Sequence, residues 1–141
     1  MKVFFDANVI LDWMLMRQPT FAESYAALRE TIRLGHESFI SSSSINDIHY
    51  VIRKALKDEP LSRAKTESML TLFYVAKVDE AVISNAVKLK GKDFEDDIIA
   101  ATAIACGADC IVTNNARDFA SYAGAIAVYS PKGYLDYLKT N

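Results

Sequence analysis

Short apolar segments alternate with longer amphipathic segments along the whole chain, and this alternation restricts the fold more than any other feature. Strand-like segments are predicted at 2–5, 38–41, 74–78, 109–112 and 126–129. Helices are predicted at 8–15, 20–34, 44–57, 61–72, 79–90, 95–106 and 131–138. Strands that alternate with helices form parallel sheets with helices on both faces. The sequence therefore predicts an α/β domain with three layers, α/β/α, around a central parallel sheet of about five strands.

The chain is predicted to be a single domain over residues 1–141. This length is enough for one hydrophobic core, and a composition of 51% apolar and 24% charged residues argues against disorder. No apolar run approaches the ~20 residues of a membrane span, and no signal-peptide pattern opens the chain. Cys106 and Cys110 lie in apolar segments without a Cys-x-x-Cys spacing. We therefore expect two small buried thiols in a cytoplasmic protein.

Acidic side chains follow several of the predicted strands. Asp6 comes directly after the first strand, Asp47 follows the second through a run of serines, and Asp118 follows the fourth. Asp96 and Asp97 lie near the start of the sixth predicted helix. Neighbouring residues of a helix point about 100° apart, so only one of the two carboxylates can face the sheet edge. Ligands of open α/β sheets bind at the carboxyl ends of the strands. Carboxylates that converge there need positive charge, and a divalent cation is the simplest source.

Each of these acids also has an ordinary structural interpretation. Asp6 could cap the helix that follows it, and the spacing from Ser44 to Asp47 resembles a capping box. Acids near the start of the sixth helix are stabilised by the helix macrodipole, and the Asn-rich segment before Asp118 could be a simple turn. Capping alone does not easily explain acids at successive strand ends, so their joint occurrence favours a shared site.

Three segments resemble the motifs of the PIN domain, a nuclease fold of many prokaryotic toxin ribonucleases. Phe4–Asp12 resembles the opening strand with its first catalytic Asp, and Phe94–Ala101 resembles the third acidic motif, with Asp96 as the ligand. Ile111–Phe119 resembles the last motif, and the matching positions are Thr113, Asn115, Asp118 and Phe119. The second motif departs from the family pattern, because Asp47 stands where most relatives carry Glu.

The resemblance implies a PIN-like fold that hydrolyses RNA phosphodiester bonds with Mg²⁺ or Mn²⁺. The expected catalytic and metal-binding residues are Asp6, Asp47, Asp96 and Asp118. The expected supporting residues are Asn8, Ser41, Asp97, Thr113 and Asn115. The family also includes toxins that form homodimers and are silenced by a small antitoxin protein, so both partners are expected here.

Positive groups near the acids are expected to bind the RNA. The formal net charge of −2 gives no general basic signal, so binding must depend on local cations. We expect these to be Arg17, Arg53, Lys92 and Arg117, which lie in or near the loops and helix starts around the acids, and His49 is a weaker candidate.

Three other functions stay open on the sequence alone. A haloacid-dehalogenase-like phosphatase needs a second Asp at the position of Asn8. A response-regulator receiver could use Asp79 and Lys132, but it needs an acidic pair after the first strand, where only Asp6 is present. A PIN-type module that binds RNA or protein without cleavage is compatible with the departure at Asp47. Metal-dependent RNA cleavage that is lost in Asp6→Asn would separate these alternatives.

Overall fold

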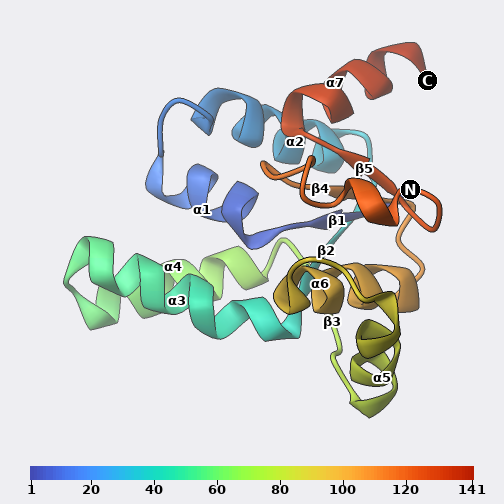
Figure 1. Cartoon of the computed structure of the whole chain (residues 1–141). Helices are drawn as coiled ribbons and strands as arrows, with labels where there is room; N and C mark the ends of the chain where they lie inside the picture. The colour runs from blue at the N-terminus through green and yellow to red at the C-terminus, as the bar shows by residue number, and fades with distance from the viewer.

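A five-stranded parallel sheet forms the middle layer of the molecule, here a computed structural model that describes residues 1–141 (Figure 1). The strands are β1 (Lys2–Phe5), β2 (Glu37–Ser41), β3 (Tyr74–Ala76), β4 (Cys110–Val112) and β5 (Ala127–Tyr129). Their order is β3-β2-β1-β4-β5, and all neighbouring strands are parallel. The predicted parallel sheet is confirmed, and the first strand of the chain is its centre.

Seven α-helices and one short 3₁₀ helix connect the strands. The helices are α1 (Ala7–Leu15), α2 (Phe21–Arg33), α3 (Ser42–Leu56), α4 (Glu59–Leu70), α5 (Glu80–Leu89), α6 (Phe94–Ala105), η1 (Ala120–Tyr122) and α7 (Pro131–Thr140). All seven predicted helices are present, with ends within two residues of the prediction. None of them combines the length and the apolar character that crossing a bilayer requires.

Successive side chains of β1 enter different halves of the core. Val3 and Phe5 pack in the larger half with buried residues of α1, α2, α3, α4 and α7. Phe4 packs in the smaller half with α6 and η1, and Ile111 of the neighbouring strand β4 joins it there. Strands that are buried on both faces need apolar residues at every position, which is why these segments are continuously apolar in the sequence.

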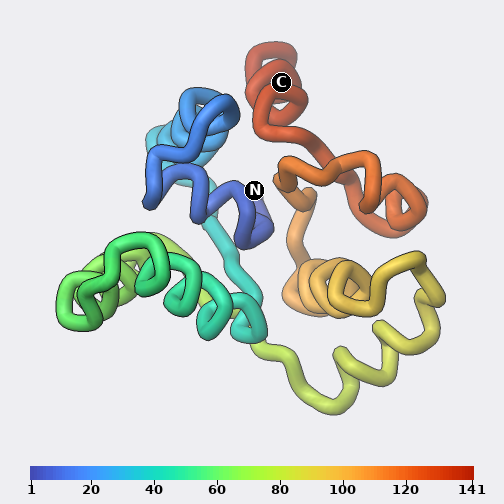
Figure 2. The backbone as a smooth tube through the Cα atoms, turned by 60° about the vertical axis from the view of Figure 1, so that its left-hand side comes forward, coloured from blue at the N-terminus to red at the C-terminus, as the bar shows by residue number.

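The α3–α4 pair forms a hairpin that extends away from the sheet (Figure 1). Ile48 and Ile52 of α3 and Met69 of α4 are fully buried and join the hairpin to the larger half of the core. Figure 2 shows that the hairpin lies apart from α5, that the N-terminal strand lies inside the molecule, and that the C-terminal helix lies at its periphery. The carboxyl end of β1 therefore lies between α3 and α6, which pack against the two different halves of the core.

Two local predictions were wrong. Helix α3 begins at Ser42, and Ser41 is its N-cap, whose hydroxyl oxygen accepts the Ser43 N–H at 3.2 Å. Ser44 therefore cannot begin a capping box, and Asp47 lies in the second turn of the helix. Cys110 is buried as expected, but Cys106 is only half-buried because it follows the last turn of α6.

Candidate active site

Asp6 lies at the carboxyl end of β1, in the middle of the sheet edge. Its Oδ1 accepts the Ala7 N–H at 2.8 Å, so it caps helix α1 as one interpretation predicted. Its Oδ2 accepts the Thr113 hydroxyl at 2.8 Å and the Asn8 amide at 3.3 Å. Burial raises the pKa of Asp6, although the hydrogen bonds from Thr113 and Ala7 lower it. Asp6 is therefore a fixed carboxylate in a site that disfavours its charge.

The loop after β4 is tied to Asp6 by a small hydrogen-bond network. The Thr113 hydroxyl oxygen accepts the Asn115 backbone N–H at 3.0 Å. The Asn8 side-chain oxygen accepts the Asn114 N–H at 3.2 Å. Asn8 and Thr113 thus lie where a supporting role requires, and Asn115 takes part through its backbone. The network fixes the position of the first residues of the loop that carries Asp118.

Two clefts open at this sheet edge, and Asp96 lines both of them. The acidic cleft has a volume of about 290 Å³, and its polar lining residues are Asp6, Ser43, Ser44, Asp47, Glu95 and Asp96. The mixed-charge cleft has a volume of about 550 Å³, and its lining residues are Lys90, Gly91, Lys92, Asp93, Asp96, Arg117, Asp118 and Ser121. The structure therefore gathers all four predicted catalytic acids around two clefts that share one carboxylate.

The electrostatics of Asp96 link the two clefts. Its pKa is raised to about 6, first by burial and then by the negative charges of Asp93, Asp6 and Asp118. Asp93 is the N-cap of α6 and accepts the Glu95 N–H at 2.8 Å, which fixes the first turn that presents Asp96. Charges from the residue after β1, from the N-cap of α6 and from the loop after β4 thus act on one carboxylate. Such mutual repulsion is what a bound cation relieves.

Asp97 points away from Asp96, as the helical geometry predicted. It is buried, and its two carboxylate oxygens accept the Gly91 N–H, each at 3.1 Å. Its Oδ1 also accepts the hydroxyl of Tyr122, a residue that the sequence did not single out. Ser41, the other expected supporting residue near this edge, is buried as the cap of α3 and makes no hydrogen bond to any of the four acids.

Two of the four predicted RNA contacts lie away from both clefts. Arg17 Nε lies 3.0 Å from Asp12 Oδ1, and Arg53 Nε lies 3.6 Å from Glu59 Oε2 at the start of α4. His49 lies next to the same carboxylate, with its Nε2 at 3.4 Å from Glu59 Oε1. These side chains contact acidic residues of α1 and α4 and line neither cleft.

The other two predicted cations, Lys92 and Arg117, line the mixed-charge cleft beside Asp96 and Asp118. Lys90 lines it as well and was not predicted. None of these three cations forms an ion pair, whereas Arg17 does. Three unpaired cations beside three carboxylates make this cleft suited to a ligand that carries both a metal-binding group and negative charge.

Asp12 is a buried carboxylate that sequence reasoning missed. Its Oδ2 accepts hydrogen bonds from the Asn114 amide at 2.5 Å, from the Thr20 hydroxyl at 2.5 Å and from the Ser24 hydroxyl at 3.1 Å. Arg17 donates to its Oδ1, so four donors stabilise the charge of Asp12. Through Asn114, Asp12 stabilises the loop after β4, and its carboxylate is not free to bind a ligand.

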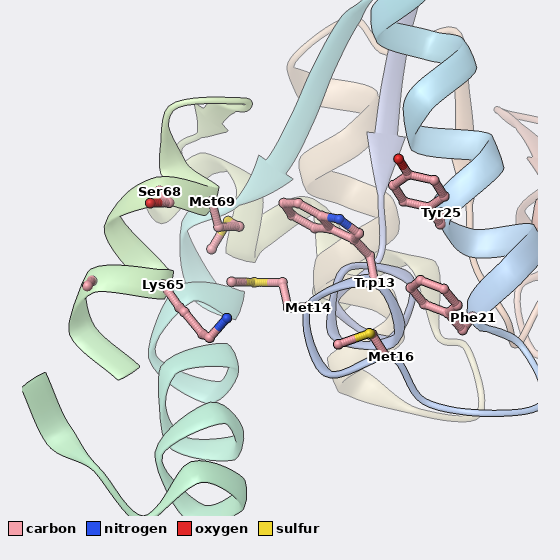
Figure 3. Close-up of a pocket in the computed structure, with 9 residues that line it drawn as sticks. Trp13, Met14, Met16, Phe21, Tyr25, Lys65, Ser68 and Met69 are labelled. Atoms are coloured by element: carbon pink, nitrogen blue, oxygen red, sulfur yellow. The ribbon is translucent and has the colours of Figure 1, made fainter. Parts of the chain in front are cut away.

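A third cleft is apolar and lies away from the acids, between α1, α2 and α4. Its volume is about 440 Å³, and seven of its nine lining residues are hydrophobic. Figure 3 shows Trp13 and Met14 of α1 directed toward Met69 of α4, with Tyr25 of α2 on the other side. Met16 is 68% exposed at the rim. This cleft has no polar constellation for chemistry and suits an apolar partner.

The donor set of the four acids fits a hard divalent cation, because it consists only of carboxylate oxygens. In the present side-chain arrangement no group of three or more His, Cys, Asp or Glu residues stands close enough to hold a metal ion. Burial, and then the charges of Asp93, Asp6 and Asp118, raise the pKa of Asp96, and a cation bound between these carboxylates would offset both effects.

The chain belongs to the PIN domain family, whose family model matches residues 2–117. A comparison with curated proteins gives no significant match. Among solved structures, the fold is similar to a chain of FitAcB from Neisseria gonorrhoeae, with a TM-score of 0.73, 22% identity, and coverage of 92% of this chain and 98% of that chain.

Two further solved structures have the same fold. One is VapBC2 from Rickettsia felis bound to a DNA fragment from their promoter, with a TM-score of 0.72, 19% identity, and coverage of 92% of this chain and 98% of that chain. The other is DNA-bound VapBC from Salmonella typhimurium, with a TM-score of 0.71, 20% identity, and coverage of 93% and 98%. At these identities the likeness concerns the fold, and it agrees with the predicted PIN-like architecture.

Proposed function

We propose that this chain is a divalent-metal-dependent endoribonuclease and the toxin of a toxin–antitoxin pair. Membership of the PIN family supports a nuclease, because the family includes nucleases. The single observation that carries the proposal is that Asp96 lines both clefts, one together with Asp6 and Asp47 and the other together with Asp118. Carboxylates from separate segments thus gather at the ligand-binding edge of a parallel sheet.

Asp6, Asp96 and Asp118 would hold the cation, Mg²⁺ or Mn²⁺, with Asp47 in direct contact or one water away. A bound divalent cation supplies an activated water at neutral pH and stabilises charge on a phosphate. The chain's own residues prepare this chemistry. Thr113 and Asn8 hold the Asp6 carboxylate in place, and the Asp93 cap orients the first turn that presents Asp96.

Lys92 and Arg117 would bind the phosphates of the RNA, because both line the cleft that Asp96 and Asp118 share. Phosphate contacts supply most of the salt-dependent affinity for nucleic acid. Charge reversal at Arg117 should weaken RNA binding and flatten its salt dependence, and it should leave affinity for Mn²⁺ nearly unchanged. Arg63→Glu offers a comparison at an exposed arginine of α4 that lies outside the cleft.

Cleavage of single-stranded RNA by the pure protein tests the proposal. Wild type should cleave with Mg²⁺ or Mn²⁺ and lose activity in EDTA, whereas Asp6→Asn should fold and bind RNA without cleaving it. Asp136→Asn, an exposed change on α7, is the matched control. RNA binding without metal-dependent cleavage in wild type would instead identify a non-catalytic PIN module.

The apolar cleft is the place where we propose that an antitoxin binds. The solved VapBC and FitAB proteins with this fold support a protein partner of this kind. An apolar segment of the partner would cover Trp13, Met16 and Tyr25, of which Met16 and Tyr25 are exposed in the chain alone. Exposed apolar surface of this kind marks protein interfaces.

Fluorescence can test this interface, because Trp13 is the only tryptophan of the chain and lines the cleft. Addition of a cognate antitoxin should shift Trp13 emission and inhibit RNA cleavage. Met16→Lys should weaken the complex about tenfold or more, as expected for a charge forced into an apolar contact. Val87→Lys on α5 is the control, because Val87 is 58% exposed and lies outside the cleft. Equal effects of the two variants would contradict the assignment.

We also propose that two copies of the chain pair in solution. Tyr74 and Val75 on the edge strand β3 are 58% and 47% exposed, which is unusual for apolar strand residues of a parallel sheet. A second copy would cover such a surface. Light scattering at micromolar concentration distinguishes dimer from monomer, and Tyr74→Lys should shift the population toward monomer.

A further inference from the structure

The loop between α5 and α6 carries two unpaired lysines into the mixed-charge cleft. Lys90 and Lys92 lie on either side of Gly91, and all three residues line the cleft with Asp96 and Asp118. Most surface lysines are mobile and merely solvated. These two are different, because the glycine between them is fixed to the protein interior.

Gly91 is held by one buried side chain. Its N–H donates to both carboxylate oxygens of Asp97, each at 3.1 Å. Asp97 is 3% exposed, and it also accepts the hydroxyl of Tyr122, which is 5% exposed. Burial and this hydrogen bond raise the pKa of Tyr122, which keeps the hydroxyl protonated as a donor. The three groups form a latch between the α5–α6 loop, helix α6 and η1.

The latch leaves no room for a side chain at position 91. A Cβ on Gly91 would overlap Asp97 Oδ1 and come within 2.5 Å of the Tyr122 oxygen. The backbone at this glycine does not adopt a positive φ. Gly91 is therefore required by close packing on Asp97, since its conformation is open to any residue. An added methyl group must push the loop away from the cleft or break the latch.

We propose that Asp97 is a positioning residue: with Gly91 and Tyr122 it fixes Lys90 and Lys92 as one wall of a subsite for a backbone phosphate of the RNA, in the cleft that Arg117 also lines. The inference rests on the proposed ribonuclease function and names the part of the cleft that holds the substrate chain. A fixed wall lowers the conformational entropy that the lysines lose on binding. The latch should therefore contribute to substrate affinity and leave the chemical step unchanged.

Gly91→Ala tests the latch, and Gly124→Ala is its matched control because a Cβ at Gly124 meets nothing within 4 Å. With Mn²⁺ and a single-stranded RNA, Gly91→Ala should raise KM roughly tenfold, or about 1.4 kcal/mol in binding, and change kcat less than about twofold. The slope of log affinity against log salt should become shallower by about 0.7 for each phosphate that the variant no longer neutralises. Gly124→Ala should match wild type in all three quantities.

A double-mutant cycle separates the latch from a general loss of structure. In the background Lys90→Ala/Lys92→Ala, the further change Gly91→Ala should leave KM unaltered, because the latch acts only through the two lysines. An equal rise in KM with and without the lysines overturns the inference. If Gly91→Ala does not fold in a thermal melt, Tyr122→Phe replaces it, since it removes one hydrogen bond and adds no atom. Its KM should rise about threefold, in line with the removal of one hydrogen bond to a charged group that keeps its other donor.

The outcomes also separate this inference from the function on which it rests. A wild-type chain that does not cleave RNA with Mn²⁺ overturns both. A wild-type chain that cleaves, together with a folded Gly91→Ala that matches Gly124→Ala in KM and salt slope, overturns the latch alone. A fall in kcat at unchanged KM also overturns it, because the loop would then act on the reacting groups.

Discussion

Asp96→Asn should stabilise the metal-free fold at neutral pH. The pKa of Asp96 is raised from 3.8 to about 6, mainly by burial and then by the charges of Asp93, Asp6 and Asp118. Because the folded pKa lies above the unfolded value, the contribution of Asp96 to stability is fully present below pH 3.8 and is lost as pH rises through about 6. At pH 7 the charged carboxylate therefore opposes folding, and the amide does not.

The size of the effect follows from the shift. A difference of about 2 pKa units corresponds to about 3 kcal/mol at 1.36 kcal/mol per unit. Asp96 is partly exposed to the solvent in the clefts, and solvent and salt screen such charges. We therefore expect Asp96→Asn to raise the free energy of unfolding by about 1–2 kcal/mol at pH 7. Near pH 4 most of this gain should disappear.

Urea unfolding in EDTA at the two pH values measures the change, with Asp136→Asn as the exposed control on α7. Added Mn²⁺ should reverse the order of stability at pH 7, because wild type gains the binding free energy and Asp96→Asn lacks one of the ligands. A variant that is no more stable than wild type at pH 7 would refute the reasoning. So would a gain of equal size near pH 4, since it could not come from the charge of Asp96.

Three other changes test separate parts of the structure. Asp47→Glu adds one methylene of reach toward the acidic cleft and should keep or raise metal-dependent cleavage; complete loss in a folded variant would contradict this. Tyr134→Phe removes the buried hydrogen bond to Thr31, at 2.9 Å, and should lower the free energy of unfolding by about 1 kcal/mol in urea. Asp12→Ala should lower it by about 3 kcal/mol or more, because Arg17 and three other donors lose their acceptor. A melt unchanged by Asp12→Ala would show that water replaces the carboxylate.

The sheet and the main acids could be predicted because their signals are local. A strand buried on both faces is continuously apolar over a few residues, as in Val3–Phe5, and its end is marked by the first charged residue, Asp6. The helical period placed only one of Asp96 and Asp97 at the sheet edge, and the structure agrees. Each inference needed only neighbours along the chain.

The supporting contacts could not be predicted because they join segments that are distant in sequence. Asn114 donates to Asp12 across 102 positions, and Tyr122 donates to Asp97 across 25. Nothing in the residues around Asp12 marks it as buried, because the donors that stabilise its charge come from several segments that meet only in the folded chain. Arg17 is a different case. Its partner Asp12 is only five residues earlier, but Arg17 lies beyond the end of α1, and no local pattern in the sequence shows that the chain turns back toward Asp12 there.

The central position of β1 has a consequence for the time at which the site can form. Asp6 leaves the ribosome first among the site residues, but Thr113, which holds its carboxylate, follows 107 residues later. Translation adds roughly 5–20 residues per second, so Asp6 waits several seconds for this partner. Strand β4, which pairs with β1, and the loop with Asp118 are equally late. A nascent chain thus carries an incomplete set of acids, and the proposed nuclease has no assembled centre while most of its own message is still being read.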